Sequence, residues 1–153
     1  MPSFSCSSEL PVAAREFLAT LTMDGVNAEL SPLVRMTAPG SFLARSIPEW
    51  PVKQPLFSSW ILLLGFLPVD RHSFFLEAVN PHQGFSERST SWVNKCWCHE
   101  RKVVSHKSGC RVTDTVKFRS RIPFVDVLLK PTYRLVFWCR HMNLRRRYGG
   151  RAS

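Results

Sequence analysis

The residues best suited to chemistry lie close together in the sequence, between Gly84 and Ser120. In this stretch a histidine, an arginine and two carboxylic acids are set among large apolar residues: Glu87, His99, Arg101 and Asp114. A histidine beside a carboxylate in an apolar cavity can serve as a general acid or base, because burial and charge adjust its pKa. An arginine beside them could hold an anionic or enolate oxygen.

Three β-strands are expected to position these side chains. Aromatic and β-branched residues are concentrated in three segments that turn-forming residues separate, and this pattern predicts consecutive antiparallel strands. The expected strands run near Phe85–Trp92, Lys95–Ser105 and Cys110–Ser120. If they form a meander, the histidine, the arginine and both acids fall on neighbouring strands.

The alternation of side chains along a strand sorts the charged residues between two faces. One face of the middle strand carries a tryptophan and a valine, so we predict that it points toward the core or a cavity: Trp97, His99, Arg101 and Val103. Asp114 lies on an otherwise apolar face of the next strand, where an acid needs a partner or water. We therefore expect Asp114 to pair with His99 or Arg101, and Glu87 to join them.

Three interpretations of these residues remain open. They can form a satisfied polar network that fixes the strand register, which we favour, or they can orient a ligand or catalyse a reaction. The catalytic candidates are His99, Asp114 and Glu87. The candidate ligand-binding residues are Trp97, His99, Arg101, Asp114 and Phe118. Arg140 and His141 form a second candidate pair, either at a cavity mouth or on an exposed helix face.

Length and composition indicate one globular domain, residues 1–153. Hydrophobic residues make up 44% of the chain and include 11 Phe and 5 Trp, which is a globular rather than a disordered composition. The longest apolar run, Trp60–Val69, is shorter than the roughly 18 residues that a membrane helix needs. The N-terminus lacks a basic region followed by an apolar one, so we expect no signal peptide and a cytoplasmic location.

The five cysteines predict neither a disulfide framework nor a metal site. Their number is odd and they are scattered in a chain without an export signal, so we expect reduced thiols that pack in the fold. Cys96, Cys98 and Cys110 lie near His99 in the sequence, but no second closely spaced pair follows, as the usual zinc sites require. We predict no metal and no cofactor.

The net charge of +10 is concentrated at the C-terminus. After Asp126 there are seven bases and no acid, whereas the rest of the chain has 14 bases and 11 acids. One short cluster is insufficient to predict nucleic-acid binding. The basic tail from about residue 145, with Arg145, Arg146 and Arg147, could make weak contact with an anionic membrane. The alternative, which we favour, is a solvated helix end whose cations suit the helix dipole.

The segments before the meander predict a strand, two short helices, a long irregular connection and two more strands. Proline, glycine and changes of hydrophobic period set their limits. The expected elements are a strand at Ser3–Leu10, a helix after Pro11 that Asp24-Gly25 breaks, a helix over Val26–Leu30, an irregular span at Ala38–Pro55, and strands at Leu56–Leu67 and Ser73–Val79 separated by a turn at Pro68–Asp70.

Helical spacing from Phe124 to Tyr148 predicts one long C-terminal helix. Pro131 falls inside this pattern and indicates a kink or a late helix start, and Gly149 ends the helix. The expected apolar stripe consists of Val125, Leu128, Leu129, Leu135, Val136, Cys139 and Leu144. An α+β fold, in which a curved antiparallel sheet of about six to seven strands wraps around this helix, is the most economical packing.

The order of these elements and several motifs resemble the START-like or Bet v 1-like superfamily, called SRPBCC, with its helix-grip fold. Within it the chain looks like the polyketide cyclase/dehydrase-like branch. The resemblance covers most of Val12–Gly149 and is carried by Glu29–Pro32, Trp60–Pro68, Gly84–Ser89, Trp97–Arg101, Val112–Val116 and Phe137–Leu144.

The resemblance implies an internal cavity between the sheet and the long helix. We therefore expect a monomer or homodimer that binds a small hydrophobic ligand, such as a lipid or a polyketide-like molecule. The alternative is a cyclase- or dehydratase-type enzyme that uses a His–carboxylate pair in the same cavity. The superfamily has no universal catalytic residue, so the resemblance assigns no catalytic role to any position.

Overall fold

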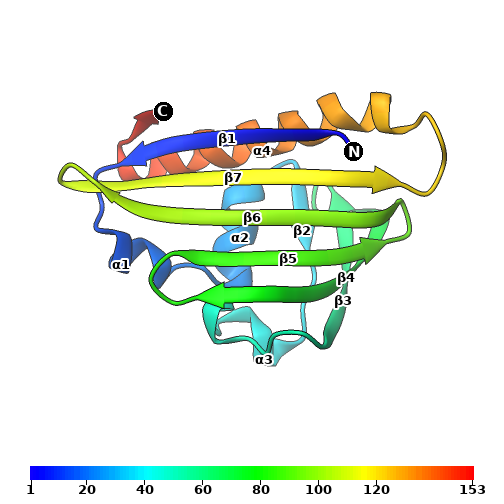
Figure 1. Cartoon of the computed structure of the whole chain (residues 1–153), viewed down its shortest axis with the longest axis horizontal. Helices are drawn as coiled ribbons and strands as arrows, with labels where there is room; N and C mark the ends of the chain where they lie inside the picture. Colours follow the sequence, from blue (N-terminus) through cyan, green and yellow to red (C-terminus); the bar gives the residue numbers. More distant parts are fainter.

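A computed structural model describes all 153 residues. One curved antiparallel sheet of eight strands, in the order β2-β3-β4-β5-β6-β7-β1-β8, wraps around the long helix α4 (Figure 1). The elements are β1 (Ser3–Leu10), α1 (Ala14–Leu18), α2 (Met23–Leu30), β2 (Val34–Met36), α3 (Gly40–Leu43), η1 (Ile47–Glu49), β3 (Pro55–Leu63), β4 (Leu67–Asn80), β5 (Gly84–Ser91), β6 (Asn94–His106), β7 (Gly109–Ser120), α4 (Asp126–Tyr148) and β8 (Arg151–Ala152). The α+β helix-grip prediction is confirmed, with slightly more strands than expected.

The predicted meander is formed by β5, β6 and β7, and its register brings the charged residues into adjacent rows. Glu87 lies opposite His99, His99 opposite Val116, and Arg101 opposite Asp114. His99, Arg101 and Val103 on β6 are buried, whereas Glu100 is exposed. The inward and outward faces predicted from alternation are therefore confirmed.

The N-terminal strand completes one side of the sheet. β1 pairs with β7 along its whole length, from Ser3 opposite Lys117 to Leu10 opposite Cys110. The two-residue strand β8, which the sequence pattern did not predict, then adds to the outer edge of β1. β1 and α4 lie side by side over much of their length (Figure 1).

Two hydrophobic clusters fill the space inside the sheet. The larger one joins α1 and α2 to the central strands and contains 16 buried residues, among them Phe17, Leu21 and Val112. The smaller one consists of Phe4, Val116, Phe118 and Phe137 and lies between α4 and the strands β1 and β7. A buried polar region separates the two clusters. It contains the charged residues that the sequence identifies as candidates for catalysis or ligand binding.

The hairpin β3–β4 differs from the prediction. The chain turns at Leu64–Phe66, where Gly65 has a φ of +86°, and not at Pro68–Asp70. β4 therefore begins at Leu67 and includes Asp70 and His72. A proline near the start of a strand is tolerated, so Pro68 lies within β4 and does not mark a turn.

The N-terminal helices also differ in detail. Asp24-Gly25 does not break a helix but lies in the first turn of α2, where the Thr22 side chain accepts a hydrogen bond from the Gly25 N–H at 3.0 Å. A Cβ atom at Gly25 would lie 2.2 Å from the carbonyl oxygen of Thr20, so glycine permits this close approach. The span predicted as irregular contains the short helices α3 and η1.

Helix α4 begins at Asp126 and contains Pro131, so of the two alternatives predicted for Pro131, a kink or a late helix start, the late start is wrong. Gly149 ends it in the left-handed conformation, as predicted. The predicted stripe is partly wrong, because Leu128 and Leu135 are 72% and 54% exposed. The buried face instead carries Phe137, Arg140, His141 and Leu144. The inner face of α4 carries polar residues, so the pattern of apolar residues predicted the wrong orientation for the helix. None of the helices combines the length and the apolarity needed to cross a membrane.

Candidate functional site

A cavity of about 220 Å³ lies between the inner face of the sheet, α2 and α4. Most of its wall is apolar: 17 of the 24 lining residues are hydrophobic. Leu63, Val69 and Thr132 line the cavity and are also exposed, so the cavity opens to solvent between the β3–β4 hairpin and α4. Below we call this opening the cavity mouth.

The apolar wall follows from the alternation of β4 and the periodicity of α2. Phe74 and Leu76 project inward from β4, and Met23, Val26 and Leu30 face them from α2. Side chains two apart on a strand, and three or four apart on a helix, share one face. The wall therefore results from regular elements rather than from a loop.

Two histidines and a glutamate form the polar part of the wall. His72 Nε2 lies 2.6 Å from Glu87 Oε1, and His99 Nδ1 lies 3.6 Å from Glu87 Oε2. All three side chains line the cavity and are at least nine-tenths buried. Glu87 thus lies between two imidazoles on neighbouring strands.

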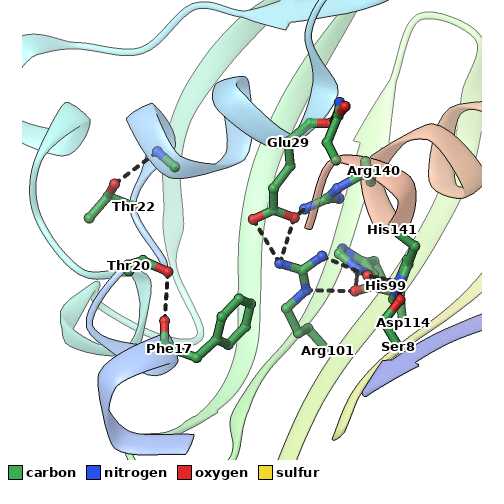
Figure 2. A network of polar contacts seen from close by, with 12 residues as sticks. Ser8, Phe17, Thr20, Thr22, Glu29, His99, Arg101, Asp114, Arg140 and His141 are labelled. Carbon is green, nitrogen blue, oxygen red and sulfur yellow. Dashed lines mark hydrogen bonds and ion pairs between the residues drawn. The ribbon is translucent and has the colours of Figure 1, made fainter. Parts of the chain in front are cut away.

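Behind this wall, Asp114 is the centre of a fully buried network (Figure 2). Arg101 donates to it twice, from Nε to Oδ1 at 2.8 Å and from Nη2 to Oδ2 at 2.6 Å. His99 Nε2 lies 2.7 Å from Oδ1, and His141 Nε2 lies 2.9 Å from Oδ2. Both carboxylate oxygens are therefore saturated by cationic or ring N–H groups.

Glu29 of α2 extends the network to the other side of Arg101, as Figure 2 shows. Arg101 Nη1 lies 2.8 Å from Glu29 Oε1, and Arg140 Nη2 from α4 lies 3.2 Å from the same oxygen. Asn143 of α4 also donates to the backbone carbonyl of Glu29 at 2.7 Å. These contacts join α2, β6 and α4 across the interior.

The network ends at β1. Ser8 Oγ lies 2.7 Å from His141 Nδ1 and accepts a hydrogen bond from Arg145 Nη1 at 2.9 Å. Arg145, which the sequence suggested for membrane contact, therefore has an internal partner, whereas Arg146 and Arg147 are exposed.

The charges in the network are balanced. Burial alone would raise the pKa of the Asp114 carboxyl, but Arg101 and the two histidines hold it well below its usual range. Burial would lower the pKa of His99, yet its hydrogen bond to Asp114 and the nearby carboxylate of Glu87 raise it. Burial likewise opposes ionisation of Glu87, but His72 and His99 lower its pKa to about 2. Arg101, Arg140 and the histidines that contact Asp114 and Glu87 thus surround the three buried carboxylates of Asp114, Glu87 and Glu29.

Two buried polar atoms of cavity-lining residues have no hydrogen-bond partner in the protein. They are Nε of Arg140, a donor, and Oδ1 of Asn94, an acceptor. Asn94 uses its amide nitrogen to donate to the Tyr133 hydroxyl at 2.7 Å. Buried polar groups are nearly always paired, so these two atoms are exceptions. Each atom is itself buried, so a ligand reaches it only if the neighbouring side chains move.

The structure divides the predicted site residues between the cavity wall and the protein interior. Trp97, His99 and Glu87 line the cavity. Arg101 and Asp114 lie one layer behind it and are 1% and 0% exposed. Phe118 belongs to the small apolar cluster and does not line the cavity. Of the second candidate pair, Arg140 lines the cavity and His141 binds Asp114; both are buried.

The sequence analysis did not single out His72, Glu29 or Ser8. His72 could have been found, because Asp70, His72, Phe74 and Leu76 alternate on one face once β4 is extended through Pro68. Glu29 and Ser8 carry no such signal. Their roles depend on α2 and β1 meeting the sheet from distant parts of the chain.

The architecture is the helix-grip fold, the fold shared by START-like and Bet v 1-like proteins. A START superfamily protein from Mycobacterium smegmatis superposes with a TM-score of 0.65 at 9% sequence identity, over 96% of this chain and 97% of that chain. The ginseng major latex-like protein 151 from Panax ginseng gives the same TM-score, identity and coverages. A protein from Chromobacterium violaceum gives a TM-score of 0.69 at 10% identity, over 94% of this chain and 95% of that chain.

Within this fold class, the chain belongs to the family described as "Domain of unknown function (DUF8410)", whose model matches residues 8–148. No curated protein matches the sequence. The similar structures therefore establish the fold, and the function has to be argued from the cavity itself.

Proposed function

We propose that the protein binds a small, mainly apolar molecule, such as a lipid or a polyketide-like compound, in the cavity between the sheet and α4. The main observation that supports this proposal is an open cavity with an apolar wall and a few convergent polar groups, which is the usual form of a ligand site. Its volume of about 220 Å³ is below the roughly 300–1,000 Å³ of typical ligand pockets, which favours a small ligand.

The unpaired atoms suggest where the polar groups of the ligand lie. An acceptor such as a carboxylate, carbonyl or ether oxygen would satisfy Arg140 Nε, and a hydroxyl would satisfy Asn94 Oδ1. Asn94 is bonded to Tyr133, which lies seven residues before Arg140 on α4. The preferred ligand is therefore an apolar molecule with two polar groups, one toward Asn94 and Tyr133 and the other toward Arg140.

The alternative function, acid–base catalysis of a cyclisation or dehydration, fits the pair of His72 and Glu87 better than it fits His99 with Asp114 or Glu87. Both ring nitrogens of His99 face carboxylates, so neither is free to exchange a proton with a ligand in the cavity. His72 and Glu87 line the cavity 2.6 Å apart and are better placed for proton transfer. Replacement of His72 by Gln would abolish such catalysis and leave binding of an apolar probe intact.

Native mass spectrometry of the purified full-length protein, with organic extraction of what it carries, tests the binding proposal. We expect one small apolar molecule per chain, or stoichiometric uptake when candidate fatty acids and aromatic compounds are added. Failure to retain any such compound, together with no uptake of an uncharged apolar dye, would refute binding in the cavity.

A further inference from the structure

A band of exposed apolar side chains surrounds the cavity mouth. On the β3–β4 hairpin, Leu64, Phe66 and Leu67 are 58%, 72% and 49% exposed. On α4, Leu128 and Leu135 are similarly exposed. They lie four residues before and three residues after the mouth residue Thr132, so they are its neighbours on the helix surface. Large exposed apolar residues that gather in one place mark an interaction surface. We call the hairpin tip and these two leucines the rim.

The apolar face of α4 in the rim continues along the helix. Leu128, Leu135 and Trp138 are spaced by seven and three residues, so they share one face, and Trp138 is also about half exposed. This face is opposite to the one that carries Phe137, Arg140 and Leu144 inside the protein. Helix α4 is therefore apolar on its outer side where a fully solvated helix would be polar.

The charges around the rim have one sign. The hairpin segment from Pro55 to Val69 contains no charged residue, and α4 has no acid after Asp126. Asp70 at the base of the hairpin is buried and accepts hydrogen bonds from the backbone N–H groups of Arg71 and Val93. Two exposed cationic residues lie beside the rim: Arg35, which pairs with Leu62 of β3, and Arg134, which precedes Leu135 on α4.

From these observations we propose that the rim docks on the surface of an anionic lipid bilayer. Apolar side chains on the hairpin and on α4 would enter the headgroup region, as amphipathic surface helices do, while Arg35 and Arg134 face the anionic lipid headgroups. A second copy of the chain is a poorer partner, because two rims would bring arginines together with no exposed acid to pair with them. Docking places the cavity mouth against the bilayer, where an apolar ligand can enter without crossing water.

The proposal is independent of which ligand the cavity takes and is tested with vesicles. The full-length protein is floated with vesicles of phosphatidylcholine alone or with added phosphatidylglycerol, at low and high salt. We expect binding to the anionic vesicles that salt weakens. Phe66→Ser and Leu128→Ser should each weaken it about tenfold or more, because a large apolar side chain no longer enters the lipid. Arg134→Glu should weaken it at least about fivefold.

Two matched variants serve as controls. Val52→Ser removes an exposed apolar residue that lies away from the rim, because the N–H of the adjacent Lys53 donates to Leu76 O in the second half of β4. This variant should bind vesicles as the wild type does. Lys102→Glu reverses an exposed charge on the outer face of β6 and should have much less effect than Arg134→Glu.

Three outcomes would overturn the docking proposal. They are no binding to anionic vesicles, rim variants that bind as well as the wild type, or a dimer in sedimentation equilibrium that Phe66→Ser dissociates. Uptake of an uncharged apolar probe without vesicles is measured in parallel. Phe66 and Leu128 do not line the cavity, so probe uptake should survive both substitutions. If the wild type does not bind the uncharged probe, the cavity proposal is refuted and the docking proposal is not.

Discussion

Arg101 and Asp114 face each other across β6 and β7 and form a two-point ion pair, with N–O distances of 2.8 and 2.6 Å, in the centre of the protein. Neither side chain is accessible to solvent. Because Asp114 also binds His99 and His141, and Arg101 also binds Glu29, this pair connects β6 and β7 to α2 and α4. The pair therefore fixes the relative positions of the strands and helices around the cavity.

Asp114→Asn should destabilise the protein by about 3–5 kcal/mol, because it leaves buried cationic groups without their counter-charge. The change keeps the size of the side chain, so the effect reports charge rather than packing. Urea unfolding at neutral pH measures it. Glu100→Gln, on the exposed face of β6, is the control and should alter the free energy of unfolding by less than about 0.5 kcal/mol. A similar small effect at Asp114 would show that the network is not structural.

The pH dependence of stability should follow Glu87 on the acid side. Its pKa is about 2 in the folded protein against an ordinary 4.5, so the unfolded chain takes up the proton first as the pH falls. The stabilisation is present above about pH 5 and should decrease toward pH 2, by up to about 3 kcal/mol from this group. Urea unfolding at several pH values measures the slope. Glu87→Gln should flatten it, and Glu77→Gln, an exposed residue, should not.

His99 should act in the opposite direction. Its pKa is raised above 6.5, so its contribution is complete below that pH and is lost as the pH rises through the folded value. These two groups together predict the greatest stability between about pH 5 and 6.5. The same unfolding series detects this, and stability that keeps rising through alkaline pH would contradict a protonated His99.

Arg140→Met should reduce the affinity for an acidic apolar ligand and spare a neutral one. Arg140 is the one arginine or lysine that lines the cavity, and a hydrogen bond to a charged group contributes about 1.5–3 kcal/mol. Calorimetric titration with decanoic acid and decanol measures the difference, for which we expect tenfold or more weaker binding of the acid. Arg134→Met, on the exposed side of the same helix, should change neither affinity. Equal losses for acid and alcohol would refute a polar contact at Arg140.

Gly149→Ala should cost about 1 kcal/mol, because Gly149 ends α4 with a φ of +76° and a side chain disfavours that conformation. No atom lies within 4 Å of the position a Cβ would take there, so the cost is conformational. Gly40→Ala, equally open but without a positive φ, is the matched control and should be neutral or stabilising. Thermal unfolding of both variants separates the two effects.

Local patterns were sufficient to predict the strands that carry the network. Alternation along β6 sorted His99 and Arg101 inward and Glu100 outward, and an isolated acid in an apolar row indicated that Asp114 has a buried partner. The meander was recoverable because its strands are consecutive and their turns are short, so register follows from local sequence.

Features that depend on distant segments were not recoverable. The orientation of α4 is set by Arg140 and His141, which are buried because Glu29, Asp114 and Ser8 reach them from other elements. Hydrophobic periodicity assigns polar residues such as these to the outer face of a helix. It therefore predicted that Leu128 and Leu135 face inward. The same error concealed the exposed apolar face of the helix.

Titration of the protein with the uncharged apolar fluorophore N-phenyl-1-naphthylamine tests the proposed cavity function most directly. Val136→Phe fills the cavity from its α4 side, and Val127→Phe makes the same change on an exposed turn of the same helix. The wild type and Val127→Phe should bind one probe per chain with equal affinity, and Val136→Phe should bind at least about tenfold more weakly while remaining folded. Absence of saturable binding in the wild type, or equal binding by both variants, would contradict ligand binding in this cavity.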